Sequence, residues 1–160
     1  MSTTVTAKQA VLDVVRTSLA SSGEADVQVL WGTAAAPWAG PEVVCVGDVA
    51  TFRSRPRMGA RTVDEQHTIT LVVGCSTKTT DEMAQHKVTA RAFHLLDLID
   101  AALKADPTES LTPAARAAGI QLGQIVGDIT LTETADGDPS VKDGRRAQIT
   151  ASVIVTARRV

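Results

Sequence analysis

The most regular hydrophobic pattern in the chain lies between residues 79 and 104, where apolar side chains recur every three or four positions. This is the repeat of an amphipathic helix. The apolar stripe consists of Ala84, Val88, Ala92, Leu95, Ile99 and Leu103, with Phe93 and Leu96 beside it. Thr79 stands where an N-cap is expected, and Glu82 stands where its capping-box partner would lie. Because such a stripe must be buried, we expect the rest of the chain to cover it.

Two further helices are predicted. Residues 5–20 place several aliphatic side chains on one side of a helix, and Gly23 stands where a left-handed residue would end it. Residues 108–119 favour a short helix that begins near Pro113 and is capped by Gly119. The apolar side of the first helix consists of Val11, Leu12, Val14, Val15 and Leu19.

Alternation of apolar and polar residues predicts the strands, because successive side chains of a strand point to opposite faces. The predicted strands are 26–31, 42–53, 62–75, 124–134 and 145–158. Gly47 and Asp48 suggest a bulge or a bend in the second strand. The third strand turns Ile69, Leu71 and Val73 inward, whereas its first half is polar on both faces. The fourth carries Ile125, Ile129 and Leu131 on one face, and the last turns Ala147, Ile149, Ala151, Val153, Val155 and Ala157 inward.

The order of these elements predicts an α+β fold. We expect a mostly antiparallel sheet with two main helices packed on one face, formed by residues 1–160 as a single domain. The second and third strands would form a long antiparallel hairpin whose tip projects beyond the core. The last strand has no charged residue from 147 to 157. Charges are a common protection of free strand edges, so this strand is either central or covered by another chain.

Composition narrows the function. A net charge of −2 argues against a general nucleic-acid binder, and an aromatic content of 2% with no tyrosine predicts an aliphatic core without stacking platforms. Cys45 and Cys75 lie in apolar strands, where two buried thiols are favoured over a disulfide. No stretch approaches the ~20 apolar residues of a membrane span, and Asp13 and Arg16 interrupt the only candidate for a leader segment. We therefore expect action or assembly in a reducing cytoplasm, without a membrane.

No catalytic motif is recognisable, so we expect no enzyme activity, no catalytic residue and no cofactor. Glu82 and His86 are one helical turn apart, but two ligands do not make a metal site, and we expect none. His67 is expected to be solvated on the polar half of its strand. The acidic stretch with Asp136, Asp138 and Asp143 is predicted to be a turn rather than a calcium loop.

The one charge cluster that stands out is a basic loop. Arg53, Arg55, Arg57 and Arg61 follow one another with no acidic residue between them. On a projecting hairpin they could dock onto an acidic partner surface or onto DNA phosphate, or they could simply keep a solvated loop soluble. Trp38, in a loop rich in Gly, Pro and Ala, could pack on the core or anchor an interface.

The layout as a whole resembles the tail terminator proteins of long-tailed, non-contractile phages. The resemblance lies in the opening helix over 5–20, the hairpin with its basic tip over 53–61, the long second helix and the closing hairpin of 127–134 and 145–160. It implies a structural protein of the virion tail, assembled in the host cytoplasm. Six subunits would form a ring that caps the tail tube, stops its polymerisation and meets the head-closure proteins.

The resemblance also implies the partners: further copies of the chain, the tail tube protein, a neck or head-closure protein, and genome DNA passing through the ring. The family offers no catalytic residue to transfer, and its interface residues form no fixed motif. Two alternatives remain. One is a neck or head-closure protein of the same virion, and the other is a small-ligand-binding α+β domain, which would need a pocket with convergent polar groups.

Overall fold

The computed structural model describes residues 3–32, 41–55, 62–79, 83–105, 111–134 and 144–159. Its elements are α1 (Thr4–Ser21), β1 (Gln28–Trp31), β2 (Glu42–Ser54), β3 (Val63–Thr77), α2 (Ala84–Lys104), α3 (Pro113–Ala117), β4 (Gln121–Thr134) and β5 (Arg145–Arg159). The strands form one five-stranded sheet in the order β1-β2-β3-β5-β4. Only β1 is parallel to its neighbour. The predicted α+β class and the mostly antiparallel sheet are confirmed.

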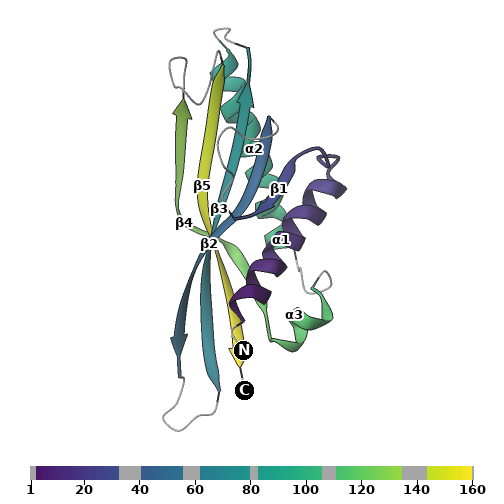
Figure 1. Cartoon of the computed structure of the whole chain (residues 1–160), viewed down its shortest axis with the longest axis vertical. Coiled ribbons are helices and arrows are strands. Elements are labelled where there is room, and N and C mark those ends of the chain that lie inside the picture. Colours follow the sequence, from purple (N-terminus) through teal and green to yellow (C-terminus); the bar gives the residue numbers. More distant parts are fainter. Residues whose placement is uncertain are drawn as a thin grey trace.

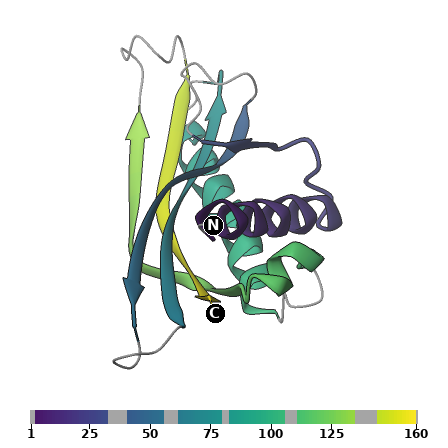
Figure 2. The ribbon, with the colours of Figure 1, turned by 60° about the horizontal axis from the view of Figure 1, so that its bottom comes forward.

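Both long helices lie on the same face of a strongly twisted sheet (Figure 1). Turning the molecule shows α1 and α2 stacked on that face, with α3 beside them (Figure 2). Among the described residues, no helix covers the opposite face. The main core lies between the helices and the sheet, and the aromatic-poor composition makes it aliphatic, as predicted.

The centre of the sheet is the pair formed by β3 and β5. Their register runs without interruption from Val63 opposite Arg159 to Thr77 opposite Arg145. Every second residue of β5 from Ala147 to Ala157 is buried against the helices. This confirms the predicted alternation and shows that β5 is a central strand.

The predicted stripe of α2 is buried, but the predicted start of the helix is wrong. Ala84, Val88, Ala92, Leu95, Leu96, Ile99 and Leu103 are buried. The helix begins at Ala84, and its N-cap is Met83, which makes no side-chain capping bond. Thr79 lies outside the helix, and its amide donates to the Thr77 hydroxyl at 3.3 Å instead. Thr79 therefore belongs to a local turn, and Glu82 lies outside the described residues.

The predicted helix ends at Gly23 and Gly119 are confirmed. Gly23 has a φ of 76° after α1, and Gly119 has a φ of 66° after α3. At Gly119 a side chain would also be crowded, because a Cβ would lie 3.1 Å from the Arg158 carbonyl oxygen. The Thr112 hydroxyl caps α3 by accepting a hydrogen bond from the Ala115 amide at 3.3 Å.

Two strands depart from regular pairing. The register of β2 against β3 shifts between Val46 and Val49, which confirms the bulge expected at Gly47 and Asp48. β4 shifts twice against β5, between Leu122 and Ile125 and between Val126 and Thr130. Ile125 and Leu131 lie opposite core residues of β5, whereas Ile129 lies inside the second irregularity. The simple alternation predicted for β4 is therefore wrong around Ile129.

We expect Leu95→Ala to lower the free energy of unfolding by roughly 2–5 kcal/mol, the usual cost of truncating a leucine in a packed core. Leu95 is fully buried between α2 and the sheet. Urea unfolding followed by circular dichroism measures the change. The control is Asp97→Ala, an exposed position on the same helix, which should change stability by less than about 0.5 kcal/mol. Equal stability of the two variants would contradict the burial of the stripe.

Candidate functional site

The first candidate site is the part of the β2–β3 hairpin that lies next to its basic loop. We call this part the foot of the hairpin. Of the predicted interface residues, the structure describes Arg53 and Arg55, whereas Trp38, Arg57 and Arg61 lie outside the described residues. The Arg53 side chain is 56% exposed, and its Nε lies 2.8 Å from Oε1 of Glu65, which is fully buried. The charge of Arg53 is therefore matched within the chain. Arg55 is exposed.

His67 contradicts its prediction, because its side chain is fully buried rather than solvated. Glu65 and His67 lie in phase with Ile69, Leu71 and Val73 and face the helices with them. The alternation of β3 therefore continues into the half that seemed polar on both faces. That continued period of two was the signal in the sequence, and the polar character of the residues obscured it.

These two buried polar residues are joined to the beginning of α1. The Thr3 hydroxyl donates to Oε2 of Glu65 and lies 2.8 Å from Nε2 of His67. On the other side of the ring, the Thr51 hydroxyl lies 2.9 Å from Nδ1 of His67 and 3.2 Å from the Thr4 hydroxyl. We call Thr3, Thr51, Glu65 and His67 the foot network. Sequence reasoning missed it, because Thr3 is 62 residues from Glu65.

Burial sets the protonation of His67. Loss of solvent lowers the pKa of its imidazole, the nearby Glu65 carboxylate opposes that shift, and the Arg53 guanidinium adds to it. The net direction is downward from an ordinary value of 6.5. The ring is therefore neutral at neutral pH, and a charged ring would be costly in this position.

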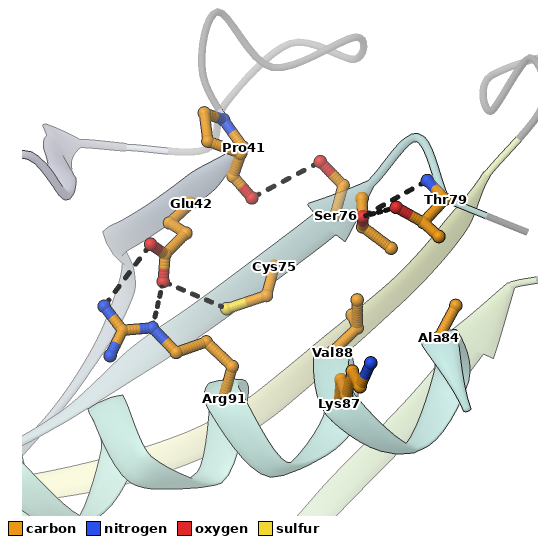
Figure 3. A pocket seen from close by; sticks show the side chains of 10 residues that line it. Pro41, Glu42, Cys75, Ser76, Thr79, Ala84, Lys87, Val88 and Arg91 are labelled. Atoms are coloured by element: carbon orange, nitrogen blue, oxygen red, sulfur yellow. Dashed lines mark hydrogen bonds and ion pairs between the residues drawn. The ribbon is translucent and has the colours of Figure 1, made fainter. Parts of the chain in front are cut away.

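The second candidate site is a pocket of about 250 Å³ between α2 and the ends of β2 and β3 (Figure 3). Arg91 of α2 reaches Glu42 at the start of β2, with Nε 2.6 Å from Oε2. The same guanidinium also binds Glu24, with Nη1 of Arg91 2.9 Å from Oε1 of Glu24. The hydrogen bond from Arg91 lowers the pKa of Glu24. This guanidinium is thus occupied by two carboxylates and joins the turn after α1, the start of β2, and α2.

Cys75 lines the same pocket, but it is not an activated nucleophile. Its thiol donates to Oε2 of Glu42 at 3.8 Å (Figure 3). Burial, reinforced by the negative charge of Glu42, raises the pKa of the Cys75 thiol to about 12. Since the thiolate is the reactive form, the pocket holds an inert thiol at neutral pH.

The two cysteines are free and buried, which confirms that prediction. Cys75 belongs to the core between sheet and helices. Cys45 lies opposite Val72, one position out of phase with the core residues Val44 and Val46. The two thiols consequently lie on opposite faces of the sheet and cannot form a disulfide without rebuilding it.

The third candidate site is the free edge formed by β4. In the described part of the chain, β4 has a neighbouring strand on one side only. Three large apolar side chains of β4 are exposed: Val126 by 41%, Ile129 by 47% and Leu131 by 38%. A long edge strand with exposed apolar side chains is usually protected or paired, so this edge is a candidate interface.

The uncovered face of the sheet continues from that edge. Its central positions carry no charge: the register sets Thr70 beside Ser152, and Thr150 between Val72 and Thr130. Ile154, beside Thr68, is an apolar exception. Phe52, which is 68% exposed, and the ion pair of Arg158 with Asp64 at 2.9 Å lie at its lower end. The face has the small polar character that the sequence predicted for the outer side of β5.

The described ranges contain neither a candidate metal-binding cluster nor a candidate membrane-spanning helix. No group of three His, Cys, Asp or Glu residues there could hold a metal ion. The acidic stretch around Asp136, Asp138 and Asp143 lies outside those ranges. None of the described helices combines the length and the apolar character that crossing a bilayer requires.

Comparison of the sequence with protein-family models and with curated proteins gave no match. The function is therefore argued from the three sites and from the layout of the chain.

We expect both thiols to resist alkylation in the folded protein. At pH 8 a thiol with a pKa near 12 is almost entirely protonated, so Cys75 should react roughly a thousandfold or more slowly than a free cysteine. Cys45, which is 2% exposed, should be slow because reagent cannot reach it. Mass spectrometry after iodoacetamide treatment measures both. The urea-unfolded chain is the control, in which both thiols should react quickly; rapid labelling of Cys75 in the native protein would refute the assigned environment.

Proposed function

We propose that this chain is a tail terminator of a long-tailed, non-contractile phage, which forms a ring on the tip of the tail tube and ends its growth. The proposal joins the resemblance of the chain layout to one structural observation, the open edge of β4. A protein that caps a polymer by closing a ring needs a surface for a second copy. The β4 edge, with its three exposed apolar side chains, supplies a surface of that kind.

The other edge of the sheet is different, and this difference favours a ring. β1 is four residues long and carries Trp31, which is 45% exposed, with the Lys8 amine 4.5 Å from its ring centre. Two unlike edges favour a head-to-tail contact rather than a symmetric pair. Such a contact closes into a ring when the rotation between copies permits it. The number six comes from the family resemblance.

The absence of charged residues in the middle of β5 is not evidence for a contact with another chain. β5 lies between β3 and β4, so its uncharged middle is explained by a central position. The free edge that needs explaining belongs to β4 instead. β4 also carries two irregularities, a feature that bends a strand and limits its pairing with other chains.

The small-ligand alternative receives less support. The pocket of Figure 3 is smaller than the ~300–1,000 Å³ of typical ligand sites, and its guanidinium is held by Glu24 and Glu42. A second hollow of about 480 Å³ beside Phe52 is large enough. Its charged groups are paired within the chain rather than converging on a vacant centre: Asp64 pairs with Arg158, and Glu65 pairs with Arg53. A neck or head-closure role in the same virion remains the nearer alternative.

We expect the double variant Val126→Lys and Ile129→Lys to abolish ring formation while leaving the fold intact. Both side chains are exposed, so stability should change by less than about 0.5 kcal/mol per site. Light scattering at high concentration measures the mass of the free protein, and electron microscopy with tail tubes measures capping. The control is Val5→Lys, an apolar residue of α1 that is 65% exposed. This control should assemble like the wild type.

Wild-type protein that stays monomeric at high concentration and never decorates tube ends would overturn the assignment. Rings that bind portal or neck proteins but not tubes would favour the head-closure alternative. Gene order gives an inexpensive independent check, because a terminator gene is expected just before the gene for the tube protein.

The basic tip is expected to dock onto a tube or neck protein. Replacing Arg55, Arg57 and Arg61 by serine should leave the melting temperature nearly unchanged but reduce assembly with either partner, because like charges on a hairpin tip steer association. The control replaces Arg16, Lys78 and Lys87, three exposed cations elsewhere, and removes the same charge. If both triple variants assemble like the wild type, the arginines serve solubility alone.

A further inference from the structure

The second irregularity of β4 is a bulge on the free edge of the sheet. Between Val126 and Thr130, β4 advances four residues while its partner β5 advances two. Gly127 opens this stretch with a φ of 74°, a conformation that glycine adopts without strain. The extra residues cannot pair with β5, so they are displaced from the ladder. Asp128 and Ile129 are both exposed there, Ile129 by 47%.

The bulge lacks a partner within the described residues. The Asp128 carboxylate makes no ion pair there, and nearly half of Ile129 remains in contact with water. A strand added along β4 would not cover them, because a bulge interrupts the row of backbone groups that such a strand needs. A surface that covers Ile129 must therefore receive a single protruding side chain rather than a regular strand.

A hollow of about 250 Å³ lies at the opposite edge of the sheet, between the end of α1 and β1. Most of its lining is apolar: Leu19, Ala20, Ala25, Val27 and Val29. Its charged lining residues are Arg16 and Glu24. Glu24 is held by Arg91, whereas Arg16 is exposed and makes no ion pair within the described residues. A cavity of about 150 Å³ already accommodates a group the size of benzene, so a branched aliphatic side chain fits this hollow.

The bulge and the hollow complement each other in shape and in charge. The bulge presents an apolar side chain with a carboxylate beside it, and the hollow is an apolar recess with a guanidinium beside it. β4 and β1 are the two opposite edges of the sheet, and Figure 1 shows α1 and β1 on the side away from β4. One chain therefore cannot place its own bulge in its own hollow, but a second copy can.

We propose that this bulge makes the contact between neighbouring copies of the chain: Ile129 of one copy enters the α1–β1 hollow of the next, and Asp128 pairs with Arg16 there. The two surfaces are unlike, so the contact is head-to-tail and leaves one bulge and one hollow free until a ring closes. The use of such a ring to cap a tube rests on the proposed function, whereas the contact itself does not.

Burial of Ile129 supplies the attraction, whereas the ion pair selects the partner surface. An exposed ion pair contributes little net affinity, but like charges brought together at an interface are strongly disfavoured. One such contact is weak, because it has to offset the lost freedom of two molecules. Ring closure makes the last contact intramolecular, which favours the complete ring over open chains. We therefore expect the free protein to associate at high concentration only.

Charge reversal tests the pairing. Asp128→Arg and Arg16→Asp should each weaken association by about tenfold or more, because each sets like charges against one another. Light scattering over a concentration series measures this. Mixing the two variants should restore association, since copies that alternate around an even-numbered ring place opposite charges at every contact. The double variant that carries both reversals in one chain should associate like the wild type for the same reason.

The matched control is Asp97→Arg, which reverses an exposed carboxylate of α2 and changes the net charge as Asp128→Arg does. It should associate like the wild type. Mixed with Arg16→Asp, it should gain no association beyond its own, which excludes a general attraction between oppositely charged chains. Single reversals that associate like the wild type would overturn the proposal, and so would a mixture of the two that stays as weak as its components.

Cysteine cross-linking tests the two surfaces directly. Ile129→Cys and Ala25→Cys are substitutions at exposed positions of the bulge and of the hollow, and the native thiols are buried. Under mild oxidation with copper phenanthroline, a mixture of the two variants should give a dimer linked between positions 129 and 25, identified by mass spectrometry. Dimers of Ile129→Cys alone would indicate a symmetric contact between two β4 edges and would overturn the proposal. A mixture that gives no dimer at high concentration would overturn it as well.

These experiments use no tube, neck protein or virion, so they separate the contact from the proposed function. Copies that interlock through positions 129 and 25 but never bind tail tubes would leave the contact standing and remove the tail assignment. A chain that caps tubes although its assembly ignores both the charge reversals and the cross-linked pair would do the reverse.

Discussion

The constraint on which the structure depends is the unbroken register between β3 and β5. All fifteen residues of β3 pair with β5 without a bulge. A slip by one residue would turn every inward side chain of one strand to the outer face. Because the register holds, Leu71, Val73, Ile149 and Val153 form one apolar surface, and the stripe of α2 packs on it. The bulge in β2 and the irregularities of β4 are tolerated because they lie beside this regular pair.

The same constraint explains the buried polar groups. Once β3 is in register, its phase places Glu65 and His67 on the helix-facing side, as it does Ile69 and Leu71. Their burial is imposed by their neighbours rather than favoured by their own chemistry, and each then requires a partner. Thr3, Thr51 and Arg53 supply those partners from two other elements. The foot network thus ties the N-terminal end of α1 to two strands that the backbone ladder already joins.

The sequence predicted well those features that depend on a few neighbouring residues or on a regular period. The body of α2, the alternation of β5, the bulge after Val46 and the caps at Gly23 and Gly119 each follow from a few neighbouring residues. The start of α2 was mispredicted because Thr79 had two local uses, and a turn with Thr77 prevailed over the helix cap. β4 was mispredicted because Gly127, with a φ of 74°, changes the phase of the strand within two residues.

The candidate site was predicted less well, because its chemistry depends on residues far apart in the chain. Arg53 was grouped with the other arginines of the loop, yet the register sets it directly opposite Glu65, and the two form an ion pair. Counting charges along the chain cannot distinguish that compensated arginine from Arg55. The pairing of Arg91 with Glu24 and Glu42 likewise joins residues 67 and 49 positions apart.

The loop end of the β2–β3 hairpin and the β4 edge of the sheet differ in how their polar groups are hydrogen-bonded, and this difference bears on assembly. Next to its loop, the hairpin pairs its buried polar side chains within the chain. Within the described residues, β4 has no strand on its outer side. That edge does not invite unlimited growth, since its irregularities limit the longest continuous regular pairing with β5 to residues 130–134. The opposite edge, β1, is four residues long. If these edges meet in neighbouring copies, the shared ladder is short and its register is restricted, which suits a contact that closes a ring rather than one that extends a fibre.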